Sequence, residues 1–185
     1  MTLRGRTFKF SALICLILYY GVAYWLPGSY APLLGGASKR FRVFLCRHIF
    51  KHCGCDVNIE RKANFGSGLD IELGDESGLG INCSIPSNTV IGRFVMMGPN
   101  CVILPHNHNF NRTDIPMCHQ GLAPKLQTII GDDVWIGRDV LMTPGRVIRK
   151  GSIIAGGCVL CKNFQEYSIV GGNPSKLIRY RIDEK

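Results

Sequence analysis

The sequence lacks the two common glycine-rich nucleotide motifs, the P-loop and the dinucleotide-binding pattern. It therefore gives no indication of nucleotide hydrolysis or hydride transfer. It also lacks an even, regularly spaced set of cysteines, because its nine cysteines fall at Cys15, Cys46, Cys53, Cys55, Cys83, Cys101, Cys118, Cys158 and Cys161. An odd and irregular set does not indicate a disulfide framework, so we interpret these residues as reduced thiols of a cytosolic protein.

Acidic residues are scarce at the N-terminal end. Residues 1–62 contain ten lysines and arginines against Asp56 and Glu60, whereas residues 63–185 contain twelve basic and eleven acidic residues. The high isoelectric point therefore belongs to the first third of the chain. This favours contact of residues 1–51 with an anionic membrane surface, with a solvated basic helix face as the alternative. It does not indicate a nucleic-acid-binding face on the rest of the chain.

Charged residues are absent from Phe10 to Leu26, after a start that carries Arg4, Arg6 and Lys9. Seventeen residues in a helix span about 25 Å, less than the ~30 Å hydrocarbon core of a bilayer. Three interpretations remain open: a helix packed on the protein or on a neighbouring subunit, an interfacial or single-span anchor, and a cleaved signal peptide. After a linker at 27–37, residues 38–53 predict an amphipathic helix beside the first repeat.

A six-residue period organises the chain from Ile130 to Gln165. Large aliphatic residues recur at its first position, at Ile130, Ile136, Met142, Ile148, Ile154 and Leu160. This period fits neither a helix nor a simple strand, and it predicts a solenoid with coils of three short strands whose aliphatic residues stack inside. Arg146 occupies a fifth position, which should be small. We expect a corner open to solvent there, or a carboxylate partner for Arg146.

Earlier repeats begin near Val57. Their inward positions are Ile59, Phe65, Ile71 and, after a two-residue slip that we assign to an outward turn at 74–78, Leu79, Ile85, Ile91, Met97 and Ile103. Residues 104–129 then form a long loop almost without periodicity. Such a loop in a compact domain usually has a function.

These hexads are followed by Tyr167-Ser168-Ile169-Val170-Gly171-Gly172-Asn173-Pro174-Ser175-Lys176. Together they resemble the hexapeptide-repeat acyltransferases over roughly residues 57–180, in particular the galactoside, maltose and capsular or exopolysaccharide O-acetyltransferases. The resemblance implies a mainly β fold, a left-handed parallel β-helix. We expect an N-terminal helical segment at 1–56, the β-helix domain at 57–165 with its protruding loop, and a tail at 166–185 with a short helix.

The resemblance also implies acetyl-CoA as the acyl donor, no required metal, and a homotrimer with active sites between subunits. His108, eight residues after Asn100, matches the catalytic histidine of the family. A histidine whose pKa lies near the working pH suits a general base. The acceptor would be a sugar or a lipid-linked saccharide, with capsular or exopolysaccharide precursors favoured by the basic N-terminus and antibiotics as the alternative. We expect a cytoplasmic protein, associated with the inner face of the membrane.

Further site residues follow from the same resemblance. Candidate acceptor contacts are Asn82, His106, Arg112 and Asp114, with Gly80 as an alternative counterpart of Asn82 and ordinary surface roles open for the other three. Candidate acetyl-CoA contacts are Arg138, Gly156, Cys161, Lys162, Lys176 and Arg179. Because CoA carries phosphates, backbone N–H groups and cations should line its path. Lys162 and Lys176 are also compatible with ordinary surface charges.

Two other functions remain open. One is a zinc protein that resembles the γ-class carbonic anhydrases and uses His106, His108 and His119. The other is a catalytically silent β-helix scaffold. The ending at 167–176 favours the transferases over the zinc protein, and His108 in an intact loop argues against the silent scaffold.

Overall fold

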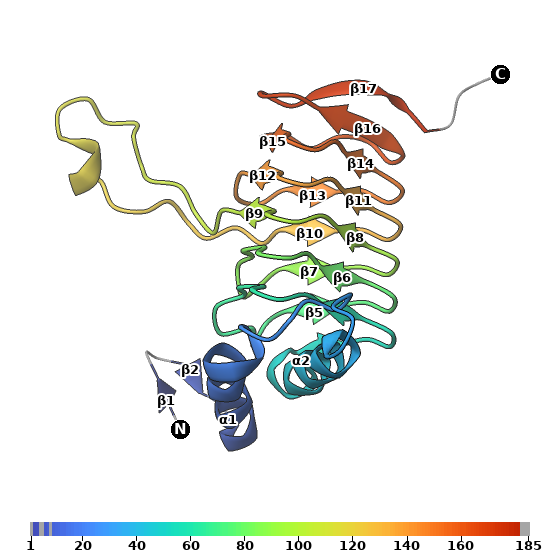
Figure 1. Ribbon diagram of the computed structural model, residues 1–185. Helices are drawn as coiled ribbons and strands as arrows, with labels where there is room; N and C mark the ends of the chain where they lie inside the picture. Colours follow the sequence, from blue (N-terminus) through green and yellow to red (C-terminus); the bar gives the residue numbers. More distant parts are fainter. Residues whose placement is uncertain (1, 4–5, 8, 182–185) are drawn as a thin grey trace.

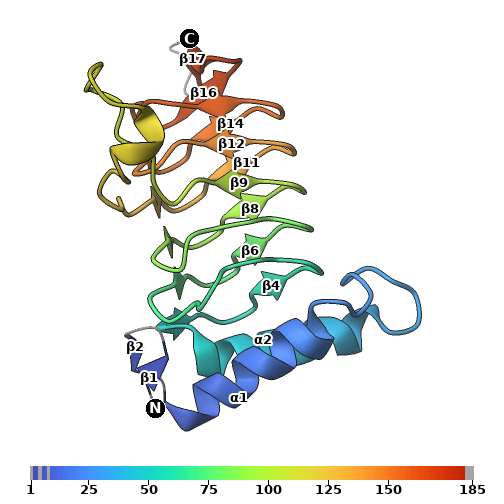
Figure 2. The ribbon, with the colours of Figure 1, turned by 90° about the vertical axis from the view of Figure 1, so that its left-hand side faces the viewer.

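The computed structural model describes residues 2–3, 6–7 and 9–181, so Arg4 lies outside the described residues. These residues form a three-sided parallel β-helix with two helices at its N-terminal end and an antiparallel strand pair at its C-terminal end (Figures 1 and 2). Two short strands, β1 (Thr2–Leu3) and β2 (Arg6–Thr7), pair antiparallel ahead of the first helix.

Short parallel strands build the three faces. The first face contains β3 (His52–Cys53), β5 (Glu72–Leu73), β7 (Val90–Ile91), β10 (Ile129–Ile130) and β13 (Val147–Ile148). The second contains β4 (Asn58–Ile59), β6 (Gly78–Leu79), β8 (Met96–Met97), β11 (Trp135–Ile136), β14 (Ile153–Ile154) and β16 (Ser168–Gly171). The third contains β9 (Val102–Ile103), β12 (Leu141–Met142) and β15 (Val159–Leu160), extended by bridges at Asn64 and Ser84.

In the two-residue strands from β4 to β15, the second residue points into the β-helix. From Ile130 to Leu160 the six aliphatic hexad positions are at most 4% exposed, which confirms the predicted inward stack. Arg146 does not take the carboxylate partner that we expected as one of two outcomes. Its Nη1 donates to the Cys161 carbonyl at 2.7 Å and its Nε to the Pro144 carbonyl at 3.2 Å. Backbone oxygens therefore satisfy the guanidinium at this corner.

The irregular coil lies earlier than the sequence suggested. Asn58 pairs with Gly78 and Asn64 with Ser84, twenty residues apart, whereas Glu72 pairs with Val90, eighteen residues apart. The two additional residues therefore fall between Asn64 and Glu72, and the assignment to 74–78 was wrong. Both Ile71 and Leu73 are fully buried. Counting six residues forward from Phe65 reaches Ile71, and counting six back from Leu79 reaches Leu73, so the sequence pattern fits either residue. The first coil also begins earlier than Val57, because β3 already pairs with β5.

Two helices cover the first coil, side by side beneath it (Figure 2). They are α1 (Phe10–Leu18), which continues as a π-helical turn η1 (Tyr19–Ala23), and α2 (Gly35–Ile49). Tyr19 is fully buried, and its hydroxyl donates to the Ala63 carbonyl at 2.9 Å. One side of this segment is therefore packed on the protein. In the described parts of the chain, no helix has the length and apolar character needed to cross a membrane.

A buried arginine joins the two helices to the coils. Arg42 of α2 is fully buried, and its Nε donates to the Ile59 carbonyl at 2.5 Å while Nη1 donates to the Pro27 carbonyl at 2.9 Å. Burial lowers the pKa of Arg42, since a guanidinium loses solvation there. Glu60 lies in the same region and accepts the Ser29 backbone N–H at 3.0 Å. These bonds fix the linker between α1 and α2 against the first coil.

In its described residues, 166–181, the tail does not form the short helix that we expected. Instead, β17 (Lys176–Tyr180) folds back antiparallel on β16. At the last coil β16 would otherwise expose an edge of backbone N–H and C=O groups, and pairing with β17 satisfies them.

The long loop leaves the β-helix between β9 and β10 and projects far to one side (Figure 1). It comprises residues 104–128, one fewer than predicted, because Ile129 already pairs with Val90. On the other side of the loop, Val102 pairs with Leu141. The coil register therefore continues across the insertion.

Candidate active site

His108 lies on a narrow two-stranded stem within the loop. It forms an isolated antiparallel bridge with Leu122. On either side, Asn109 N–H donates to the Gly121 carbonyl at 3.0 Å and Ala123 N–H donates to the Asn107 carbonyl at 2.8 Å. The His108 side chain is exposed, and His106, nearer the coils, is half-buried. The stem thus holds an accessible imidazole outside the β-helix.

The end of the loop is a compact polar turn. Arg112 and Asp114 form an ion pair with Nε and Oδ1 3.0 Å apart, and this bond lowers the pKa of the Asp114 carboxyl. Gln120 bridges the backbone of Arg112, accepting its N–H at 3.1 Å and donating to its carbonyl at 2.8 Å. Arg112 and Gln120 also line a hollow of about 340 Å³ with Asn109, Asn111, Ile115 and His119. The two predicted acceptor contacts, Arg112 and Asp114, therefore help to hold the shape of the loop.

Asn82 belongs to a ladder of amides along one corner of the coils. Its Nδ2 donates to Asn100 Oδ1 at 3.0 Å, and Asn100 Nδ2 donates to Asp139 Oδ1 at 2.7 Å. All three residues have positive φ angles, 57°, 60° and 58° in that order. Asn and Asp tolerate this left-handed backbone better than other non-glycine residues. Asn100 and Asp139 were not among the predicted site residues.

Arg138 and Gly156 occupy consecutive coils next to this ladder. Gly157 N–H donates to the Arg138 carbonyl at 2.9 Å, and a Cβ added at Gly156 would lie 3.2 Å from the same oxygen. Arg138, Gly156 and Gly157 are exposed. The structure therefore brings this predicted pair together, with accessible backbone beside a cation.

The last coil brings Cys161 together with Ser175. Cys161 N–H donates to Ser175 Oγ at 3.2 Å, and the thiol lies 3.3 Å from the same hydroxyl. The Ser175 hydrogen bond lowers the pKa of the exposed Cys161 thiol. Ser175 itself is buried and was not predicted as a site residue, although it precedes Lys176 directly.

The remaining predicted cations lie at the same end of the β-helix. Lys162 Nζ lies over the Phe164 ring, 5.6 Å from its centroid. Lys176 begins β17, and Arg179, further along that strand, donates to the Tyr180 carbonyl at 3.1 Å. Exposed glycine backbone and several cations form a donor set that suits a ligand with phosphates.

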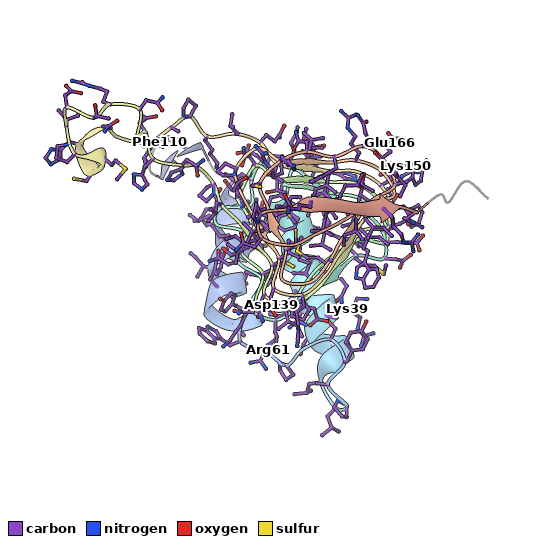
Figure 3. All side chains as sticks on the ribbon, turned by 90° about the horizontal axis from the view of Figure 1, so that it is seen from above. Lys39, Arg61, Phe110, Asp139, Lys150 and Glu166 are labelled. Atoms are coloured by element: carbon purple, nitrogen blue, oxygen red, sulfur yellow. The ribbon has the colours of Figure 1, made fainter. Side chains whose placement is uncertain are left out.

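The end of the loop lies away from the coils that carry Arg138 (Figure 3). Figure 3 shows Phe110, two residues beyond His108, well out to the side, whereas Asp139, next to Arg138, lies at the coils. Across residues 2–3, 6–7 and 9–181, no three His, Cys, Asp or Glu side chains are grouped to hold a metal ion. The zinc alternative, with His106, His108 and His119, therefore has no ligand set in this part of the chain.

Comparison with known proteins identifies the class. No family model matches the chain. A putative acetyltransferase of Saccharomyces cerevisiae is 33% identical over 154 residues, which cover 82% of this chain and 76% of that protein. The chain therefore belongs to the acetyltransferases, and its stacked hexads place it among the hexapeptide-repeat members, as the resemblance implied.

Two further relatives differ in extent. A putative lipopolysaccharide biosynthesis O-acetyl transferase of Escherichia coli K12 is 27% identical over 166 residues, covering 74% of this chain and 84% of that protein. A chloramphenicol acetyltransferase of Agrobacterium fabrum is 42% identical over 64 residues, and that match covers 35% of this chain and 31% of the Agrobacterium enzyme. Less than a third of that relative's length is therefore matched.

Two solved structures share the fold. A maltose O-acetyltransferase from Clostridium difficile 630 has a TM-score of 0.74 at 24% identity, covering 94% of this chain and 87% of that chain. A galactoside acetyltransferase in complex with coenzyme A has a TM-score of 0.73 at 23% identity, covering 92% and 80%. These similarities establish the left-handed β-helix fold.

Proposed function

We propose that this protein transfers the acetyl group of acetyl-CoA to a hydroxyl of a saccharide, with His108 as general base. The observation that carries this proposal is the placement of His108 in a member of the acetyltransferases. It is exposed on a hydrogen-bonded stem that projects away from its own coils, while Arg138, Gly156, Cys161 and Lys162 lie on those coils. A base on a projecting loop suits a site completed by a neighbouring subunit.

The chemistry follows from these groups. His108 accepts the proton of the acceptor hydroxyl as that oxygen adds to the thioester carbonyl. The C–S bond then breaks, and His108 returns the proton to the departing thiolate, giving an acetyl ester and CoA. Acetyl-CoA supplies the activated carbonyl. Arg138 and Gly156, together with Cys161, Lys162, Lys176 and Arg179, would bind it through backbone N–H groups and cations.

The saccharide class rests on two kinds of support. Maltose and galactoside acetyltransferases share the fold, and a relative that covers three quarters of the chain is a putative lipopolysaccharide O-acetyl transferase. On this chain, Asn82, His106, Arg112 and Asp114 would contact the acceptor. The cytoplasmic location would extend to the inner face of the membrane, where lipid-linked precursors are available. Chloramphenicol is the competing acceptor, because several relatives are named for it.

The first test measures CoA formation by chromatography, since the exposed Cys55, Cys118 and Cys161 would react with a thiol reagent. A panel of sugars, oligosaccharides and chloramphenicol is screened with the wild type, His108→Ala and the control His119→Ala. We expect acceptor-dependent CoA formation that falls about 10²–10⁴-fold in His108→Ala only. Full activity of His108→Ala would refute the base. Acetyl-CoA binding with chloramphenicol as the one productive acceptor would refute the saccharide class.

A second test addresses the homotrimer. His108→Ala and Gly156→Tyr each remove one half of the proposed site. If the site lies between subunits, co-expression of the two variants restores part of the activity, because some interfaces combine an intact His108 with an intact Gly156. Restoration together with a trimeric mass supports the proposal. A site within one chain would give no restoration.

A further inference from the structure

The outward side of the first helix is apolar along its length. The buried side of α1 and η1 carries Ala12, Cys15, Tyr19 and Ala23. Opposite them, Phe10 is 72% exposed, Ile17 63% and Ile14 43%. A surface helix in water normally presents polar residues there, and a contiguous apolar face marks a contact surface. Since no charged residue occurs from Phe10 to Leu26, this face has no charged border of its own.

Aromatic and aliphatic side chains are also exposed in the segment that follows α1. Trp25 is 62% exposed, and Lys62 Nζ lies 5.4 Å from the centroid of its ring. In the linker to α2, Tyr30 is 90% exposed and Leu33 96%. Tryptophan and tyrosine with an accessible apolar body are typical of the region where a bilayer meets water.

The outward side of α2 combines an apolar residue with cations. Phe44 is 56% exposed, and Arg40 and Arg47, one helical turn away on either side, are exposed as well. These three residues line an open groove of about 720 Å³ together with Gly36, Lys39, Val43, Asp56 and Val57. Three cations against one carboxylate give this groove a net positive charge.

We infer that the α1–α2 cap docks on the surface of an anionic lipid bilayer. The docking face comprises Phe10, Ile14, Ile17, Arg40, Phe44 and Arg47. Its apolar side chains would enter the boundary between headgroups and acyl chains, and its arginines would bind lipid phosphates. The helix α1 has nine residues and lies across the end of the β-helix, so it rests in the plane of the membrane (Figure 2).

Charge decides in favour of a bilayer over a second copy of the chain. Residues 1–62 carry ten lysines and arginines against two acidic residues. Two caps in contact would bring Arg40 and Arg47 against the same cations of the other copy, which costs energy when water is excluded. An anionic bilayer complements both the cations and the apolar face. The inference adds to the proposed function a location beside lipid-linked acceptors, but acetyl transfer to a soluble sugar does not depend on it.

The test is co-sedimentation of residues 1–185 with sucrose-loaded vesicles, of phosphatidylcholine alone or with about one third phosphatidylglycerol. The apolar variant is Phe10→Ser/Ile17→Ser, whose control is Met117→Ser, an equally exposed loop residue. The charge variant is Arg40→Gln/Arg47→Gln, whose control is Arg149→Gln/Lys150→Gln at the far coils. Circular dichroism and thermal melting establish that each variant is folded.

We expect binding to the anionic vesicles that weakens with added salt. The charge variant should lose about fivefold in affinity per arginine, the apolar variant at least tenfold, and neither control should change. The inference would be overturned if the apolar variant and the charge variant both bound the anionic vesicles as tightly as the wild type. It would also be overturned if the wild type did not bind anionic vesicles. If the molecular mass doubled as the protein concentration rose, and did not double in the apolar variant, this face would be assigned to contact with a second copy of the chain. CoA formation with a soluble sugar, measured on the same samples, reports separately on the proposed function.

Discussion

Arg42 donates through Nε to the carbonyl of Ile59, a residue of the first coil seventeen positions later. Both residues are fully buried, so the bond forms where water cannot replace it. The helical cap is therefore attached to the β-helix by a directional polar contact as well as by apolar packing.

Replacing Arg42 with methionine should destabilise the protein by about 2–4 kcal/mol, because the Ile59 and Pro27 carbonyls lose their donors. The measurement is urea unfolding followed by circular dichroism. Arg40→Met on the exposed side of the same helix serves as the control and should change stability little. Similar stability of the two variants would mean that the buried bonds contribute nothing net.

Glu60 should make the stability of the protein depend on acid. Burial on its own would raise the pKa of Glu60, but hydrogen bonds from Ser29, Asn58 and Arg61 hold it below the ordinary 4.5. A carboxyl with a depressed pKa stabilises the folded state above the unfolded pKa, and that stabilisation is lost as pH falls through the folded pKa.

Unfolding of the wild type and Glu60→Gln between pH 7 and pH 3 measures this contribution. At pH 7 the variant should be less stable, and the difference should shrink below about pH 4.5. The other carboxylates contribute to both proteins alike. A difference that stays constant over this range would exclude Glu60 as its source.

Gly98 should not accept a methyl group. A Cβ at this position would lie 2.7 Å from the Arg138 backbone nitrogen on the next coil, so the coils would have to shift. We expect Gly98→Ala to cost about 1–3 kcal/mol. Gly36→Ala in α2 is the matched control, since a Cβ there meets nothing within 4 Å. It should be neutral or stabilise by up to about 1 kcal/mol. Equal effects at both positions would refute this account of coil spacing.

Cys161 should react faster with alkylating reagents than its exposure alone explains. The Ser175 hydrogen bond lowers its pKa below the ordinary 9.0, so more thiolate is present at pH 8. Mass spectrometry of iodoacetamide labelling against pH gives the profile, with the exposed Cys118 as internal standard. In Ser175→Ala the Cys161 profile should move to higher pH while that of Cys118 stays in place. An unchanged Cys161 profile would remove Ser175 as the cause.

Much of the coil architecture follows from the sequence because one physical rule generates it. Each two-residue strand from β4 to β15 buries only its second residue, so aliphatic residues every six positions identify the strands from Ile130 to Leu160. The rule fails where two inward candidates lie two residues apart, as at Ile71 and Leu73, because burial alone does not fix the register. It also carries no information about β17, whose exposed side chains form a strand through pairing with the edge of β16.

The site was predictable only in part. The positions of Arg138 and Gly156 follow from their eighteen-residue spacing, which is one coil. The same spacing relates Asn82 to Asn100, so the ladder that includes Asp139 could have been found by counting coils. The contact of Ser175 with Cys161 could not, because it depends on how the chain turns back after the last coil.

The coil register continues across residues 104–128, since Val102 and Ile129 keep their partners on neighbouring coils. The β-helix therefore tolerates changes in the length and sequence of this segment without a change in the pairing of its coils. Closing a loop twice as long costs only about 0.6 kcal/mol more. Selection on the segment 104–128 and selection on the thermal stability of the coils can consequently act on separate parts of one gene. Exchanging the segment between relatives would show whether it selects the acceptor, without any change to the β-helix that supports it.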